Sequence, residues 1–482
     1  MNTVQLLIQG ESTDARSGAT FERRNPVTNE VVTTAAAASP ADAVAAVVAA
    51  QQAFAAWSKT GPAERRSMLT KAADELERHL PNLIATMVSE TGASELWAGF
   101  NAVTAVGILR EAAALTTQIN GEVIPSDVPG NLALAVRQPA GVSLGIAPWN
   151  APLILGVRAI AVPLACGNTV VFKASESCPA THRAIADAFT RAGVPAGVVN
   201  FISNAPADAG PVVAAMVAHP AVRRVNFTGS TKVGKIIAAQ CAEHLKPVVL
   251  ELGGKAPLLV LDDADLDQAV DGTIFGAFLN SGQICMSTER IIVDESVADE
   301  FVARLARKAR TLTPGAAGSG AALGSVIDQT TVDRCNLLLD DALQAGGQLL
   351  CGGRADSTLM LPTLIDHVTP TMKIYSEESF GPVKGIVRVR GVEEAVRCAN
   401  DNAYGLSAAV YGRDIARALQ VAQRIESGIC HVNGPTVHDE PQMPFGGVKA
   451  SGVGRFGGRA GIDAFTDLRW LSIQTTPRHY PI

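Results

Sequence analysis

The chain has 482 residues, which is too long for one simple core, so we expect two or three domains. Hydrophobic residues make up 47% of it and charged residues 18%, enough apolar surface for large cores. A net charge of −6 supplies no broad basic field, which argues against nucleic acid as a partner. The eight cysteines form no CxxC pair and no histidine cluster at ligand spacing, so we expect reduced thiols and no metal site.

The first residues carry no basic segment followed by a long apolar stretch. No run along the chain approaches the roughly 20 apolar residues that a membrane helix needs. We therefore expect a cytoplasmic protein without a membrane partner.

The N-terminal part predicts helices after a short strand-like start. Ser39 and Pro40 begin an alanine-rich helix that runs to Trp57, with serine as its cap and proline in its first turn. A second helix follows Pro62, with apolar residues at helical spacing. A third segment contains Trp97, which either packs in a core or forms an aromatic wall for a ring-shaped substrate.

A polar hairpin is predicted over residues 120–138, and a regular alternation follows it. Strand-like, β-branched runs are separated by helix-length segments, which is typical of a doubly wound α/β fold with a parallel sheet. These runs are 142–147, 169–172, 198–202, 222–227 and 248–250.

A nucleotide site is predicted at the end of the fourth of these strands. The usual Gly-x-Gly-x-x-Gly fingerprint is missing, and the segment from Phe227 to Gly234 takes its place as a strand end followed by a helix start. Backbone N–H groups at Gly229 and Ser230 would face a pyrophosphate there. A second α/β unit is expected beyond residue 285, with helices at 297–311 and 331–345 and strands at 385–389 and 408–411.

Cys285 is the candidate nucleophile, since it follows a Gly-Gln turn at the end of an apolar segment. A free thiol with a pKa near ~8.5 is mostly protonated at neutral pH and needs a base or a positive field. Glu251 lies between leucines and precedes two glycines, which makes it a candidate general base with a raised pKa.

Four segments together resemble the aldehyde dehydrogenase superfamily, and the resemblance runs nearly end to end: 251–255, 282–285, 377–382 and 444–449. It implies a Rossmann-type NAD-binding domain, a catalytic α/β domain and a small oligomerisation hairpin. The implied boundaries are 1–118 with 139–251 for NAD binding, 252–447 for catalysis, and 119–138 with 468–482 for assembly into a homodimer or homotetramer.

The resemblance also implies a reaction. Cys285 would add to an aldehyde, Asn150 and the Cys285 N–H would hold the oxyanion, hydride would pass to NAD, and Glu251 would activate water to hydrolyse the thioester. Relatives that transfer the acyl group to coenzyme A lack a base at this position, so Glu251 favours hydrolysis. Neither metal nor flavin is required.

The cofactor residues follow from the same resemblance. Lys173 and Glu176 would hold the adenosine ribose, and a carboxylate there favours NAD over NADP because it repels a 2′-phosphate. Glu378 and Phe380 would hold the nicotinamide ribose and ring. The remaining expected contacts are Pro148, Trp149, Val233, Gly234 and Leu252.

Several stretches, 93–101, 282–290, 433–440 and 477–482 among them, look like the bacterial branch that oxidises aromatic aldehydes, so a vanillin-like aldehyde is the predicted substrate. Trp97 and Phe445 would enclose its ring and Arg158 would reach its oxygen substituents; a surface salt bridge is the alternative for Arg158. Ile284, Met286 and His438 complete the predicted substrate set, although His438 and Asp439 also fit ordinary surface-loop residues.

Other functions stay open at this point. Salicylaldehyde, benzaldehyde or a broad range of aldehydes are the alternative substrates. An acylating dehydrogenase, a thiol esterase and a non-catalytic structural protein on the same fold are the alternative classes.

Overall fold

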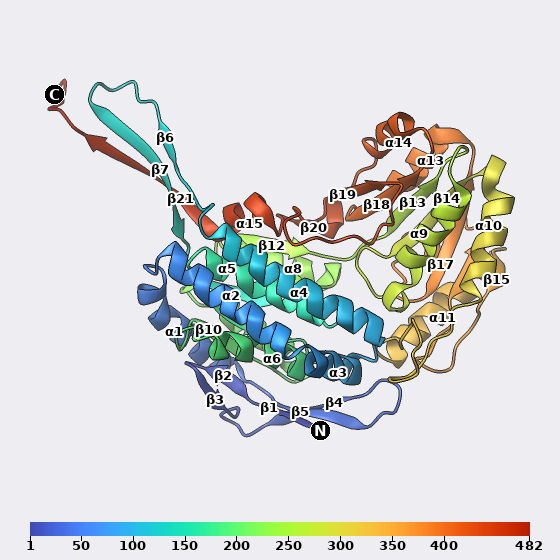
Figure 1. Cartoon of the computed structure of the whole chain (residues 1–482), viewed down its shortest axis with the longest axis horizontal. Coiled ribbons are helices and arrows are strands. Elements are labelled where there is room, and N and C mark those ends of the chain that lie inside the picture. Colours follow the sequence, from blue (N-terminus) through green and yellow to red (C-terminus); the bar gives the residue numbers. More distant parts are fainter.

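A computed structural model describes all residues, 1–482, as two lobes that lie side by side (Figure 1). The first lobe contains an eight-stranded sheet in the order β20-β12-β11-β8-β9-β10-β2-β3. Its five central strands are parallel, as the strand–helix alternation predicts, and they are β8 (Val142–Ile146), β9 (Thr169–Lys173), β10 (Val199–Ile202), β11 (Val222–Thr228) and β12 (Val248–Glu251). The outer strands β2 (Leu6–Ile8), β3 (Glu11–Thr13) and β20 (Gly452–Val453) are antiparallel.

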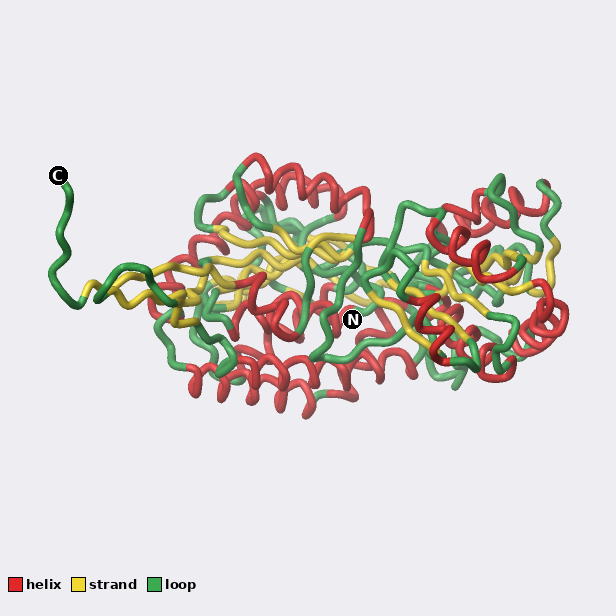
Figure 2. Tube along the Cα trace, turned by 90° about the horizontal axis from the view of Figure 1, so that it is seen from above, coloured by secondary structure: helices red, strands yellow, loops and turns green.

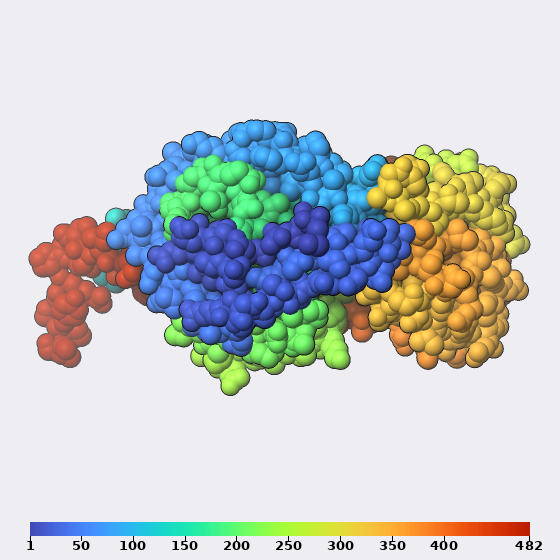
Figure 3. Space-filling model, turned by 90° about the horizontal axis from the view of Figure 1, so that it is seen from below, coloured from blue at the N-terminus to red at the C-terminus, as the bar shows by residue number.

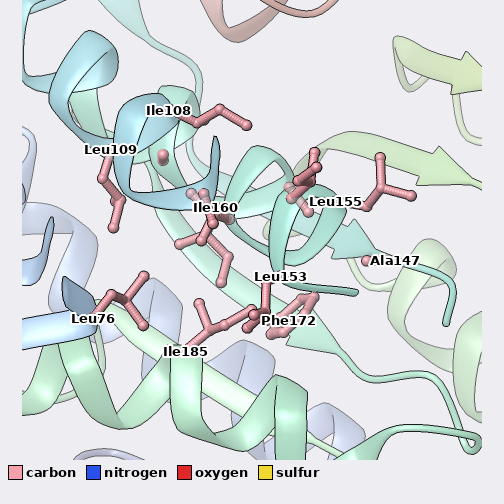
Figure 4. Packing of buried hydrophobic residues seen from close by; sticks show 14 of the residues in the cluster. Leu76, Ile108, Leu109, Ala147, Leu153, Leu155, Ile160, Phe172 and Ile185 are labelled. Atoms are coloured by element: carbon pink, nitrogen blue, oxygen red, sulfur yellow. The ribbon is translucent and has the colours of Figure 1, made fainter. Parts of the chain in front are cut away.

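Helices cover both faces of this sheet. α1 (Pro40–Trp57) begins where the sequence predicts, because Ser39 and Asp42 cap it reciprocally. Large apolar side chains from α2, α4, α5, α6 and β9 interlock in one core, as Leu76, Leu109, Leu153, Phe172 and Ile185 illustrate (Figure 4). The helices are α2 (Pro62–Arg78), α3 (Leu80–Thr91), α4 (Glu95–Leu115), α5 (Pro152–Ala165), α6 (Pro179–Arg191), α7 (Ala209–Ala218), α8 (Thr231–Glu243) and, late in the chain, α15 (Gly458–Phe465).

The second lobe is built on a seven-stranded sheet in the order β15-β16-β17-β14-β13-β18-β19. Only β15 (Gln348–Cys351) is antiparallel to its neighbour; the others are β13 (Ala256–Val260), β14 (Thr288–Asp294), β16 (Thr363–Asp366), β17 (Val383–Val389), β18 (Ser407–Tyr411) and β19 (Ile429–Val432). The helices of this lobe are α9 (Leu266–Phe278), α10 (Glu295–Ala309), α11 (Gln329–Gln344), α12 (Lys373–Ser376), α13 (Gly391–Asn400) and α14 (Ile415–Ala422). The tube in Figure 2 shows the two sheets in succession along the long axis.

Four residues connect the two sheets, from the end of β12 to the start of β13. A Cβ at Gly254, in this link, would lie 2.5 Å from the backbone carbonyl oxygen of Cys285. Glycine is therefore required here by close approach of the backbone. Later in the chain β20 returns to the first sheet and pairs with β12 next to Glu251.

A narrow arm projects from the first lobe (Figures 1 and 2). It consists of β6 (Glu122–Ile124) and β7 (Asn131–Pro139), which form the predicted hairpin, and of β21 (Thr466–Gln474), which pairs with β7 over nine residues. The last residues of the chain extend beyond the arm, as the space-filling view shows (Figure 3).

A small N-terminal sheet lies on the face seen in Figure 3 and contains β1 (Asn2–Val4), β4 (Thr20–Arg24) and β5 (Val31–Ala36) in the order β1-β5-β4. None of the fifteen α-helices combines the length and the apolar character needed to cross a bilayer.

Candidate active site

The loops after β8, β11 and β12 meet the loop before β14 around one cavity of about 380 Å³. This is the carboxyl edge of a parallel sheet, where α/β proteins bind their ligands. Nine predicted residues line the cavity: Pro148, Trp149, Asn150, Gly229, Ser230, Glu251, Cys285, Glu378 and Phe380. Seven lining residues were not predicted: Thr228, Gly253, Ile327, Asp328, Thr330, Thr331 and Arg334.

Glu251 is the last residue of β12 and is only 1% exposed. Neither of its carboxylate oxygens has a hydrogen-bond partner. Burial is the main reason that its pKa rises to about 7, while the neighbouring Cys285 thiol and the charge of Arg158 act in the opposite direction. A carboxyl group with a pKa near neutrality can accept and return a proton at working pH.

Cys285 follows a strained turn in which Asn280 and Ser281 have φ values of 50° and 53°. Gln283 fixes this turn: its amide donates to the carbonyls of Asn280 at 3.1 Å and Ser325 at 3.2 Å, and its side-chain oxygen accepts the N–H of Ile327 at 2.8 Å. The loop before the nucleophile is therefore tied to the segment that lines the far side of the cavity.

Burial also raises the pKa of the Cys285 thiol well above its usual value, and the negative charge of Glu251 adds to this effect. The resting thiol thus keeps its proton at neutral pH. Nucleophilic attack requires that a group next to the sulfur take the proton, and Glu251 is the carboxylate beside it.

Two N–H groups near the sulfur are free to stabilise an oxyanion. Asn150 donates one amide N–H to the Gln283 carbonyl at 3.1 Å, which leaves its second N–H unused. The backbone N–H of Cys285 donates to no acceptor in the chain. A pair of fixed donors of this kind is what an oxyanion hole needs.

Trp97 lies behind this oxyanion amide and does not line the cavity. It is 2% exposed, its indole N–H donates to the backbone carbonyl of Asn150 at 2.8 Å, and its ring stacks on Phe100 with centroids 5.5 Å apart. The Asn280 amide donates to the same carbonyl at 3.1 Å. Trp97 therefore does not form a wall of the cavity in the structure; it supports Asn150, whose side-chain amide faces the oxyanion position.

The predicted nicotinamide end of the cavity lies at Glu378 and Phe380. The Glu378 side chain accepts the N–H of Gly254 at 2.9 Å, and burial raises its pKa to about 7. Phe380 has a φ of 43° and meets Trp149 edge to face, with ring centroids 5.8 Å apart. Arg334, on α11, donates to the Ser379 carbonyl at 3.0 Å and so fixes the backbone next to Phe380.

A buried ion cluster, which was not predicted from the sequence, holds the same loop. Glu289 accepts from Lys255 at 2.8 Å, from Lys384 at 2.5 Å and from the N–H of Ser379 at 2.9 Å. Burial raises the pKa of Glu289, but the two lysines outweigh it and bring the value down to about 2. The cluster fixes the loop backbone between Glu378 and Phe380.

The other predicted cofactor residues lie outside the lining of this cavity. Lys173 ends β9 and pairs with Glu176, whose carboxylate also accepts from Asn204 at 3.0 Å. Val233, in the first turn of α8, donates its N–H at 3.3 Å to the side chain of Ser230, which caps this helix. Gly234, within α8, packs against Leu252.

These residues fit a dinucleotide. The Gly229 N–H donates to the Glu251 carbonyl at 3.0 Å, so the prediction that it faces a pyrophosphate is wrong. The positive end of α8, with the N–H of Ser230 that no acceptor in the chain takes, suits a pyrophosphate, and the carboxylate of Glu176 suits ribose hydroxyls. The residue types and their order along one sheet edge match a nicotinamide dinucleotide extended toward Cys285.

The predicted substrate residues include a buried ion pair. Arg158, on α5, donates to Asp439 at 2.6 Å, and their side chains are 6% and 7% exposed. Its guanidinium lies over the Phe445 ring, 4.4 Å from the centroid. The surface alternatives for Arg158 and Asp439 are therefore wrong.

His438 lies on the surface, in contrast to its neighbour Asp439. It pairs with Glu440 at 3.0 Å and packs against His431, with ring centroids 5.1 Å apart. Ile284 and Met286, on either side of the nucleophile, are buried. His438 is therefore a surface-loop residue in the structure.

The fold and this site agree with a comparison to known families. The sequence profile described as "Aldehyde dehydrogenase family" matches residues 13–471. The chain belongs to the aldehyde dehydrogenase family.

Individual relatives are similar over the whole chain. It is 60% identical to a vanillin dehydrogenase from Pseudomonas fluorescens over 483 residues, covering 100% of both chains. It is 49% identical to a salicylaldehyde dehydrogenase from Pseudomonas putida, covering 99% of both. A crystal structure of a salicylaldehyde dehydrogenase from Pseudomonas putida G7, complexed with salicylaldehyde, superposes with a TM-score of 0.99 at 48% identity and 100% coverage of both chains.

Proposed function

We propose that this chain catalyses the NAD-dependent oxidation of an aromatic aldehyde, vanillin-like in its substituents, to the carboxylic acid. The observation that carries the proposal is the convergence of Cys285, Glu251 and two unused N–H groups on one cavity. A nucleophile, a base near neutral pKa and an oxyanion hole are the parts that acyl chemistry requires.

The residues divide the work. Cys285 passes its proton to Glu251 and its sulfur adds to the aldehyde carbon, while the second N–H of Asn150 and the Cys285 N–H hold the oxygen that becomes negative. When bound, the nicotinamide supplies the acceptor for the hydride that leaves this carbon. Glu251 then releases the proton from Cys285 to solvent and takes a proton from water, whose oxygen attacks the thioester. The C–S bond breaks, the acid is released, and the Cys285 thiolate recovers a proton from Glu251.

NAD is the proposed cofactor, and Glu176 is the residue that selects it. The residues around the cavity fit either nicotinamide dinucleotide, and structural neighbours include both an NAD-dependent aldehyde dehydrogenase from Sinorhizobium meliloti and an NADP-dependent enzyme from E. coli. The Glu176 carboxylate would accept ribose hydroxyls but would repel the charge of a 2′-phosphate.

The aromatic substrate is supported by the names of the relatives and by a buried group of charged and aromatic side chains that lies outside the lining of the cavity. Vanillin dehydrogenases at 60% identity stand above salicylaldehyde dehydrogenases at 49%. Arg158, Asp439 and Phe445 place a charged pair and an aromatic face together, which suits a ring that bears oxygen. Salicylaldehyde is the second candidate, favoured by the TM-score of 0.99 to the enzyme crystallised with it.

We also propose that the chain assembles into a homodimer or homotetramer and acts in the cytoplasm. The arm of β6, β7 and β21 leaves apolar side chains exposed, with Val123 at 72%, Leu468 at 63% and Trp470 at 75%. A second copy of the chain would cover them. Light scattering on purified protein measures the assembly.

The test of the catalytic proposal is NADH production across vanillin, salicylaldehyde, benzaldehyde and a short aliphatic aldehyde, with Cys285→Ala as the blank. We expect the highest kcat/KM for vanillin with NAD and no turnover in the blank. Preference for the aliphatic aldehyde would contradict the aromatic assignment, and turnover in the blank would contradict the nucleophile.

A further inference from the structure

The ion pair of Arg158 and Asp439 joins parts of the chain that lie 281 residues apart. Arg158 comes from α5 in the first lobe, and Asp439 from the loop between β19 and β20. Their contact is the only hydrogen bond that either side chain makes within the chain. The guanidinium also lies 4.4 Å from the centroid of Phe445 and 6.0 Å from that of Phe456, so the pair has an aromatic surround.

The pair lies beside the catalytic centre. The positive charge of Arg158 acts on both Glu251 and Cys285, and the negative charge of Asp439 acts on Glu251. Phe445, over which the guanidinium lies, belongs to the same buried apolar cluster as Ile284 and Met286, and Cys285 packs against that cluster. The pair therefore lies near the reacting groups, outside the residues that line the cavity.

The pair is incompletely satisfied. Asp439 Oδ2 accepts from Arg158, but Oδ1 is buried without any hydrogen-bond partner. Arg158 uses one of its five N–H groups. A buried charged pair is a costly way to brace a loop, since two apolar residues of the same volume often do so equally well. A group that both donates and accepts would satisfy what the pair leaves open.

A hydroxyl on an aromatic ring is such a group, because it donates one hydrogen and accepts another. We propose, on the basis of the function above, that Asp439 determines specificity for hydroxylated aromatic aldehydes: its Oδ1 accepts the hydroxyl hydrogen, while the Arg158 that it holds donates to the hydroxyl oxygen. Phe445 fixes the plane of the guanidinium. Recognition of the ring hydroxyl thus depends on both residues, and Asp439 accepts its hydrogen.

The test compares each hydroxybenzaldehyde with the analogue that carries methyl in place of hydroxyl at the same ring position. The 4- and 2-substituted pairs are measured at a pH at which the phenol is protonated. In the unaltered protein we expect that, at one of the two ring positions, kcat/KM for the hydroxybenzaldehyde exceeds that for its methyl analogue by roughly ten- to a hundred-fold. A site with buried polar groups rejects an analogue that leaves them unpaired.

Asp439→Asn keeps the shape of the side chain but removes its charge, and we expect this preference, the ratio of kcat/KM for the hydroxyl compound over its methyl analogue, to fall at least ten-fold. Glu440→Gln is the matched control, since it removes the same charge from the next residue, whose side chain is 42% exposed. Its preference should equal that of the unaltered protein. If Asp439→Asn alone destabilises the fold, because the Arg158 charge stays buried without a partner, the double variant Arg158→Gln/Asp439→Asn is measured in its place. It removes both charges of the pair together.

Equal kcat/KM for the hydroxyl and methyl compounds in the unaltered protein would overturn the inference, and so would a preference that survives in Asp439→Asn. Both results leave the proposed function intact so long as benzaldehyde is oxidised. Failure to oxidise any aromatic aldehyde, in contrast, would reject the proposed function itself.

Discussion

Replacement of Glu251 by glutamine should separate the two halves of the reaction. The amide keeps the shape of the side chain but cannot take a proton from water, so hydrolysis of the thioester should slow by roughly 10²- to 10⁴-fold. Hydride transfer precedes this step, but in the variant the Cys285 thiol has to lose its proton to solvent. A rapid mixing experiment should therefore still give one NADH per active site, at a lower rate than in the unaltered protein but faster than the thioester is hydrolysed. The slow phase that follows should then limit the steady state.

The pH dependence follows from the same group. Because the pKa of Glu251 is about 7, the base is present above this pH, and steady-state turnover should decline as the pH falls through 7. The variant should lack this decline.

The variant should also gain stability at high pH. A carboxyl whose pKa rises from 4.5 to about 7 on folding favours the folded state below pH 4.5 and loses this contribution as the pH rises to 7. The buried charge then costs roughly 3 kcal/mol, at about 1.4 kcal/mol for each pH unit of the rise. Glutamine removes this cost, so thermal unfolding at pH 8 should move to higher temperature. Steady-state turnover within ten-fold of the unaltered protein, with the decline near pH 7 retained, would refute the role of Glu251.

Three further variants test the rest of the site. Asn150→Ala removes an oxyanion donor and should lower kcat by roughly 10²- to 10³-fold; a loss below ten-fold would contradict the oxyanion hole. Glu176→Gln removes the charge that opposes a 2′-phosphate, so the ratio of kcat/KM for NAD over NADP should fall at least ten-fold, and an unchanged ratio would assign selection elsewhere. Gly254→Ala brings a Cβ to 2.5 Å from the Cys285 carbonyl and should lower both kcat and melting temperature, whereas Gly210→Ala, where a Cβ meets nothing within 4 Å, should lower neither.

The parts of the fold that depend on residues close together in the sequence were predictable. Ser39 and Pro40 locate the start of α1 because a cap and a first-turn proline act within one turn of helix. The parallel strands were predictable because their hydrophobic runs are buried on both faces. The nucleophile, the base and the oxyanion residue were found through motifs, and the structure brings all three to one cavity.

The contacts that depend on the tertiary fold were not predictable. No local pattern tells Asp439, which is buried against Arg158, from the exposed His438 beside it. Trp97 was found as a rare aromatic residue, but its role behind Asn150 depends on a hydrogen bond between residues 53 positions apart. The same holds for Arg334, which reaches the cavity from the second lobe.

Identification of the covalent intermediate would show which residue is the nucleophile. The Glu251→Gln variant, mixed with NAD and vanillin and quenched with acid within one turnover, is digested and analysed by mass spectrometry. We expect one aroyl group on the peptide that contains Cys285, with the other seven cysteines unmodified. An aroyl group on a different residue, or a full burst of NADH without any adduct, would contradict the assignment of Cys285 as the nucleophile.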